Sequence, residues 1–135
     1  VLITDTLRTN ARQAELYAKG RETKGPKVTN ARPGQSFHNY GVAWDAVPWE
    51  FMVNDPDKLL VGHKLDWTPF KRRELEQRFR QHRDLKTLDR RWRVMAEKAA
   101  ELNIEWAGMW ESMTEYCHFQ FTGGRSLDDF RQAVA

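Results

Sequence analysis

Residues 36–45 read SFHNYGVAWD, a segment in which a histidine and an aspartate stand on either side of a glycine. Gly41 lies midway between His38 and Asp45, and glycine suits a tight bend or a close backbone approach. Residues 42–47 then read as a short strand, in which alternation places Ala43 and Asp45 on one face. Because alanine is small, it leaves room for an ion beside the carboxylate. The segment therefore predicts a bend and a strand that present an imidazole and a carboxylate.

A second segment, EYCHFQ at residues 115–120, carries the complementary groups. Residues 117–121 read as a strand, on which His118 and Gln120 share one face. Alternation turns three other side chains toward the core: Cys117, Phe119 and Phe121. Two imidazoles and one carboxylate leave a fourth position open for water, which is the ligand pattern of a catalytic zinc site. Glu115 supplies a nearby carboxylate that can accept a proton.

Residue types alone are also compatible with histidines and an aspartate that bind no metal. A histidine near an aspartate often occurs by chance, as a satisfied core or surface pair. His63 and His82 have no partners at ligand spacing and are read as loop and helix residues. Trp106 and Trp110 either line a cleft or pack in the core.

Composition describes a globular chain of 135 residues, with 40% hydrophobic and 30% charged residues. We expect one catalytic domain over residues 1–135. The single cysteine excludes an internal disulfide. The sequence has no apolar run of transmembrane length and no signal-peptide pattern. Because the chain starts at Val1 in strand-like sequence, we expect that a segment upstream was processed or trimmed, and an export signal could have been lost with it.

Strand and helix signals are mixed without βαβ alternation, which favours an α+β fold. Residues 1–7 read as a strand, Thr9 or Asn10 caps a helix that stops at Gly20, and residues 20–35 read as a loop. Thr68 and Pro69 predict the start of a basic helix that runs to about residue 83. A helix from about residue 88 places five residues on one face: Trp92, Met95, Ala96, Ala99 and Leu102. Residues 55–57 predict a turn, and Ser126 predicts the cap of a last helix with Leu127 and Phe130 inward.

Charge is concentrated between residues 71 and 93, which hold ten Lys/Arg and four Asp/Glu, for a local charge of +6. One interpretation is a solvated helical face. The other is attachment to an anionic wall polymer or to lipopolysaccharide. Nucleic acid ranks third, because the segment has no nucleic-acid motif and its charges surround the helix instead of forming one stripe.

The order of the site residues resembles the zinc peptidases of the D-alanyl-D-alanine carboxypeptidase family. The pattern Ser-x-His-x-x-Gly-x-Ala-x-Asp at residues 36–45, with an acidic residue three positions before His118, carries this resemblance. Arg8-Thr9, followed after three residues by Gln13, is similar to an upstream family element. The form His-Asn-Tyr-Gly looks most like the phage endolysin branch, the L-alanyl-D-glutamate peptidases. The chain departs from that branch at Met109, where a carboxylate is usual, and at Glu115, where aspartate is usual.

The resemblance implies a small antiparallel sheet with packed helices, the fold shared with hedgehog domains. It implies Zn²⁺ held by His38, Asp45 and His118. It implies Glu115 as the general base and Arg8 beside the substrate. Three residues would support the site or contact substrate: Gln13, Ser36 and Trp110.

The implied activity is hydrolysis of the L-alanyl-D-glutamate bond in the peptide stem of peptidoglycan, by an endolysin. Two alternatives remain: a D-alanyl-D-alanine carboxypeptidase, and a non-catalytic module that binds the cell wall. Residues 51–92 look like a basic helical insertion. We expect a monomer that does not bind nucleic acid, has no transmembrane segment, and occupies the host cytoplasm until it is released to the peptidoglycan or periplasm.

Overall fold

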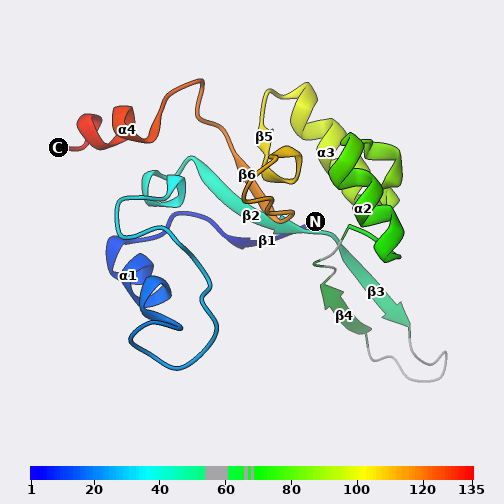
Figure 1. Ribbon diagram of the computed structural model, residues 1–135, viewed down its shortest axis with the longest axis horizontal. Helices are drawn as coiled ribbons and strands as arrows, with labels where there is room; N and C mark the ends of the chain where they lie inside the picture. The colour runs from blue at the N-terminus through cyan, green and yellow to red at the C-terminus, as the bar shows by residue number, and fades with distance from the viewer. Residues whose placement is uncertain (54–60, 66, 68) are drawn as a thin grey trace. The chain divides into compact units, whose positions relative to one another are not determined.

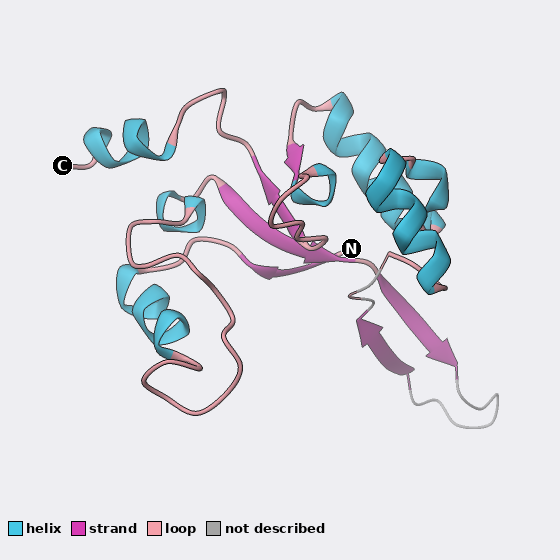
Figure 2. Cartoon of the chain, viewed as in Figure 1, coloured by secondary structure: helices cyan, strands magenta, loops and turns pink. Residues whose placement is uncertain are grey.

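The computed structural model describes residues 1–53, 61–65, 67 and 69–135. Figures 1 and 2 show a mixture of short strands and helices, which agrees with the predicted α+β class. The strands are β1 (Leu2–Asp5), β2 (Ala43–Val47), β3 (Trp49–Val53), β4 (Val61–Leu65), β5 (Glu105–Trp106) and β6 (His118–Gln120). The α-helices are α1 (Asn10–Ala18), α2 (Arg73–His82), α3 (Arg90–Glu101) and α4 (Leu127–Ala133). Three 3-10 helices complete the fold: η1 (Phe37–Tyr40), η2 (Leu85–Thr87) and η3 (Ala107–Met109).

A four-stranded antiparallel sheet has the order β1-β2-β6-β5. The Ala46 amide donates to the Cys117 carbonyl at 2.8 Å, and the Phe121 amide donates to the Val42 carbonyl at 2.8 Å. These two bonds set an antiparallel register between β2 and β6. Strands β3 and β4 form a separate antiparallel pair, with Trp49 opposite Leu65 and Val53 opposite Val61.

The chain forms two compact units, residues 1–4 with 45–119 and residues 5–44 with 120–135. Aromatic packing builds the core of the first unit. Trp106 stacks on Phe119 with ring centroids 6.3 Å apart and on Trp92 at 6.5 Å, and it lies 6.1 Å from Phe79. Gly108 is required here, because a Cβ at that position would lie 2.2 Å from the Trp106 ring. α2 and α3 thus pack through Phe79 and Trp92 around one tryptophan.

The second unit has a smaller core around Phe130 of α4. The Phe130 ring lies 5.8 Å from both the Phe37 and the Tyr40 ring. Helix α1 begins as predicted, because the Thr9 side chain accepts from the Arg12 amide at 3.1 Å. Ser126 is the N-cap of α4, as predicted, and forms a capping box with Asp129.

The predicted start of the basic helix at Thr68 and Pro69 is wrong by several residues. Helix α2 begins at Arg73, and no side chain caps it. Pro69 and Phe70 are buried, and the Pro69 carbonyl accepts from the Asp89 amide at 2.8 Å. Packing against the N-terminus of α3 therefore overrides the helix-start signal at residues 68 and 69. The cap predicted at Thr68 and the turn predicted at residues 55–57 lie outside the described residues.

Two side chains predicted to face inward are exposed. Leu102 is 57% exposed because it is the C-cap of α3, one residue past the end of the buried stripe. Phe121 is 50% exposed because β6 ends at Gln120, so that strand alternation no longer governs its position. Of the segment predicted as a helical insertion, β3 and β4 form the first part, and α2 and η2 the second.

No helix in the described parts of the chain has the length and apolar character needed to cross a membrane.

Candidate metal centre

Asp45 and His118 lie opposite each other on the adjacent strands β2 and β6. The register between β2 and β6 makes them a directly opposed pair of the non-hydrogen-bonded type, in which side chains approach most closely. The His118 Nδ1 atom lies 3.4 Å from an Asp45 carboxylate oxygen. The His118 side chain is largely buried, whereas Asp45 remains partly open to solvent. Strand pairing therefore produces the carboxylate–imidazole pair without help from a loop.

Glu115 is the second carboxylate near His118. One of its oxygens lies 4.0 Å from His118 Nδ1, and its side chain is 55% exposed. The Glu115 amide donates to the Ala107 carbonyl at 3.3 Å, and its carbonyl accepts from the His118 amide at 3.3 Å. The backbone thus fixes Glu115 beside His118, while its carboxylate stays accessible to water.

Trp110 covers another side of His118. The indole and imidazole centroids lie 5.6 Å apart, with the rings tilted by 52°. This contact assigns Trp110 to the surroundings of a candidate ligand, whereas Trp106 belongs to the core. The two tryptophans, which sequence could not separate, therefore have different roles.

His38 lies on η1, a turn that is stabilised by its own residues. The Ser36 side chain accepts from the His38 amide at 3.4 Å and forms a capping box with Asn39. At the other end Gly41 has φ +70°, a left-handed conformation that favours glycine. Asn39 also donates to the Arg8 carbonyl at 2.9 Å, which ties the turn to the end of β1. Ser36 and Gly41 therefore shape the turn that carries His38.

A backbone carbonyl orients the His38 ring. His38 Nδ1 lies 2.8 Å from the Thr6 carbonyl oxygen. Because that oxygen can only accept, Nδ1 carries the proton, and Nε2 is the nitrogen with the lone pair in the neutral ring. Metal-binding histidines commonly have this arrangement, in which the second nitrogen donates to a carbonyl or carboxylate. The buried ring of His38 is thus held in a tautomer suited to a metal ligand.

Asp5 and Gln13 hold the Arg8 guanidinium. Its Nε and Nη2 atoms donate to the Asp5 carboxylate, and its Nη1 atom donates to the Gln13 side-chain oxygen at 3.0 Å. Gln13 is fully buried, and its amide nitrogen donates to the Ala31 carbonyl at 2.7 Å. Sequence reasoning gave Asp5 no special role, although its spacing of three residues from Arg8 was a signal. We place Asp5 and Gln13 as residues that position Arg8.

Cys117 lies next to His118 but is not among the residues whose ligand atoms converge there. Burial raises the pKa of its thiol to about 12, and the charges of Asp45 and Glu115 act in the same direction. Metals bind the thiolate, which this environment disfavours. Cys117 therefore fits the predicted role of a small packing residue.

One ligand atom from each of His38, Asp45 and His118 lies within 4.8 Å of the others. Two imidazoles and one carboxylate match the protein ligands of catalytic zinc sites. The donor set, and the tautomer of His38, fit a divalent metal ion.

Comparison with known proteins shows the family of the chain. Residues 29–121 match the family model described as D-alanyl-D-alanine carboxypeptidase. This chain belongs to that family. It is also similar to the peptidoglycan L-alanyl-D-glutamate endopeptidase CwlK of Bacillus subtilis (strain 168), with 32% identity over 120 residues. The match covers 89% of this chain and 59% of the relative, so the chain spans about three fifths of the length of that curated protein.

Proposed function

We propose that the chain is a zinc-dependent peptidoglycan peptidase that cuts the L-alanyl-D-glutamate bond of the peptide stem. The observation that carries the proposal is the opposed pair Asp45 and His118 with Glu115 beside it, in a chain of this family. The similarity to an enzyme named for that bond supports the choice of substrate.

In this proposal His38, Asp45 and His118 hold the metal. When bound, a zinc ion lowers the pKa of its water and polarises a carbonyl group. Glu115 accepts a proton from the attacking water as the oxygen adds to the scissile carbonyl carbon. Glu115 then gives that proton to the leaving amine as the C–N bond breaks. The partly exposed position of Glu115 allows it to meet both water and substrate.

Arg8 supplies positive charge for the oxygen that becomes negative during the reaction. Its bonds to Asp5 and Gln13 fix the direction of the guanidinium in advance. Ser36 acts through the His38 turn, and Trp110 lies where substrate approaches His118. Release from a host cytoplasm to the wall, phage origin and a monomeric state stay predictions.

Digestion of purified peptidoglycan tests the bond. New N-terminal D-glutamate, found by mass spectrometry, supports the endopeptidase. Released D-alanine would instead support the carboxypeptidase. Binding to peptidoglycan without new termini, in the presence of zinc, would establish the non-catalytic module.

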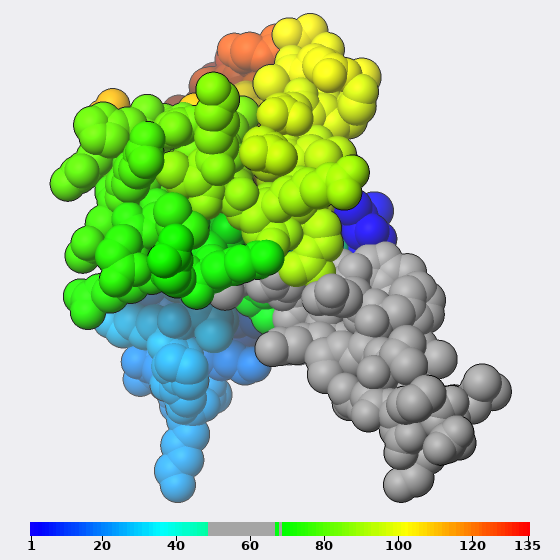
Figure 3. All heavy atoms as spheres, turned by 90° about the vertical axis from the view of Figure 1, so that its right-hand side faces the viewer, coloured from blue at the N-terminus to red at the C-terminus, as the bar shows by residue number. Residues whose placement is uncertain are grey.

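We also propose that the outer surface of α2 and α3 attaches to an anionic wall polymer. Figure 3 shows these helices, in green to yellow, on one face of the molecule. Asp89, Glu76 and Asp84 pair with part of the basic set. Of the ten cations at residues 71–93, all of which the structure describes, six have no ion-pair partner among the described residues: Arg72, Arg73, Arg83, Lys86, Arg90 and Arg93.

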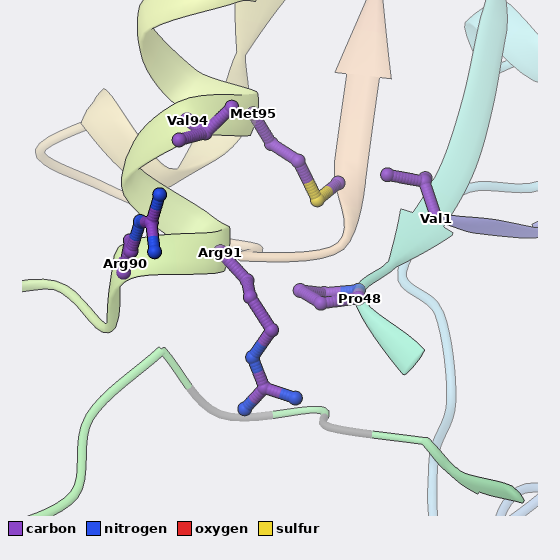
Figure 4. Close-up of a pocket in the computed structure, with 6 residues that line it drawn as sticks. All are labelled: Val1, Pro48, Arg90, Arg91, Val94 and Met95. Atoms are coloured by element: carbon purple, nitrogen blue, oxygen red, sulfur yellow. The ribbon is translucent and has the colours of Figure 1, made fainter. Parts of the chain in front are cut away.

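A pocket beside the start of α3 adds to this surface. Arg90 and Arg91 line it together with the apolar Val94, Met95 and Pro48 (Figure 4). Val1 completes the lining, and the predicted metal ligands take no part in it. The basic surface is therefore separate in its residues from the candidate metal centre.

A further inference from the structure

Helix α2 ends on an unusual residue. Arg83 is the C-cap of α2 and has φ +50°, in the left-handed region where glycine is favoured. Its amide donates to the Phe79 carbonyl at 2.6 Å, so this backbone conformation closes the helix. Among the described residues only Asn103 and Met113 share a positive φ without being glycine. An arginine here carries a conformational cost that a glycine would avoid, which directs attention to its side chain.

The Arg83 side chain reaches a segment about 25 residues away. Its Nη1 atom donates to the Gly108 carbonyl at 3.3 Å, and its Nη2 atom donates to the Trp110 carbonyl at 2.8 Å. The Trp110 carbonyl also accepts from the Thr114 hydroxyl at 2.7 Å. A planar guanidinium with fixed donors can hold two carbonyls at a set spacing, whereas the single rotatable ammonium of lysine does so less rigidly. Arg83 therefore sets the path of the backbone through residues 108–110.

That backbone carries the indole that packs on His118. The backbone carbonyl of Trp110 accepts from Arg83, and the indole of Trp110 lies 5.6 Å from the His118 imidazole, measured between ring centroids. Helix α2 also contacts the far end of the same segment, because Phe79 lies 6.4 Å from the Tyr116 ring. Both ends of the segment that leads to His118 thus rest on one helix.

We propose that Arg83 is a positioning residue, which holds Trp110 against His118 and so limits the orientations open to this ring. The inference rests on the proposed function for its catalytic consequence. It gives part of the 51–92 segment a role within the site, in addition to any role of its outer charges. Groups that orient a metal ligand typically change metal affinity or activity by about 10- to 100-fold when removed.

The test replaces Arg83 by glycine. Arg83→Gly keeps the left-handed backbone and removes only the side chain, so α2 is expected to close normally. Arg83→Lys keeps the positive charge but lacks the planar guanidinium with its fixed donors. Gln81→Ala is the control, because Gln81 is an exposed residue of the same helix that belongs neither to the candidate metal centre nor to the basic surface.

Three readouts separate positioning from general structure. They are the Co²⁺ affinity and absorption spectrum, the division of any loss between kcat and KM on peptidoglycan fragments, and the NMR signal of the Trp110 indole N–H. For Arg83→Gly we expect a shifted Trp110 signal, a changed Co²⁺ spectrum and a kcat lowered about tenfold. Arg83→Lys should lie between Arg83→Gly and the parent, and Gln81→Ala should match the parent.

An active parent with an Arg83→Gly variant that keeps the Trp110 signal, the Co²⁺ spectrum and kcat would overturn the inference. A parent without hydrolysis whose Trp110 signal still shifts in Arg83→Gly would overturn the proposed function and leave the positioning role standing. If Arg83→Gly fails to fold, the Trp110 signal of Arg83→Lys decides: an unchanged signal rejects the positioning role.

Discussion

The two candidate imidazole ligands are supported in opposite ways. The His38 turn owes its shape to neighbours within a few residues, namely Ser36, Asn39 and Gly41. His118 depends on residues far along the chain: Asp45 across the sheet, Trp110 over its ring, and Arg83 behind Trp110. The backbone turn at His38 is therefore encoded locally, although the Thr6 carbonyl, 32 residues away, orients its ring, whereas the surroundings of His118 come from other segments of the chain. Damage at a distance should reach His118 more readily than His38.

The largest expected effect comes from removing either ligand. His38→Ala and His118→Ala should each abolish stoichiometric zinc and reduce hydrolysis to the assay background, because two remaining ligands hold the ion poorly. Metal analysis of the purified proteins measures this. His82→Ala, an exposed histidine at the end of α2, is the control and should keep its zinc. Unchanged metal content in either ligand variant would remove that residue from the site.

Glu115→Gln tests whether Glu115 transfers the proton without removing a proposed zinc ligand. The amide keeps the size of the side chain but cannot accept the proton, so kcat should fall by roughly 10²- to 10⁴-fold. Zinc content should stay near one ion per chain, because Glu115 is not a proposed ligand. Steady-state kinetics with metal analysis checks both. A fully active variant would show that another group is the base.

Gly41→Ala tests the local support of His38. An added Cβ meets only Leu7 Cδ1 at 3.7 Å, an ordinary contact, so the cost is conformational. A left-handed alanine should lower the free energy of unfolding by about 1–2 kcal/mol. Urea unfolding measures the loss, and Gly41→Asn should lose less because asparagine tolerates this conformation. Equal stability in Gly41→Ala would mean that the turn relaxes.

The smallest effect concerns the outer face of α2 and α3. Arg73→Gln and Arg90→Gln should each weaken binding to an anionic wall polymer by about 0.2–1 kcal/mol, as exposed charge pairs do. The difference should shrink as salt rises from 0.05 M to 0.5 M. Co-sedimentation with the polymer measures binding, and hydrolysis of soluble peptide fragments serves as the control that should not change. If neither the two substitutions nor the salt concentration changes polymer binding, the polymer proposal is rejected.

Local signals predicted much of the site. The spacing of residues 36–45 and strand alternation pointed to His38, Asp45 and His118, whose ligand atoms converge in the structure, and Thr9 and Ser126 marked real helix starts. The predicted start of α2 was wrong because Pro69 and Phe70 are buried beside the N-terminus of α3. No local sequence signal reveals that burial. Arg83 looked like one more surface charge, since nothing nearby in sequence announces two carbonyls about 25 residues away.

Sequence by itself determined the residue types of the site, the bend at Gly41 and the faces of its two strands, because turns and alternation depend on neighbouring residues. Only the tertiary structure decided that Asp45 stands opposite His118, that Trp110 covers His118 while Trp106 enters the core, and that Asp5 and Gln13 hold Arg8. Those outcomes depend on strand register and on which buried groups find hydrogen-bond partners, and both are set when distant segments pack together.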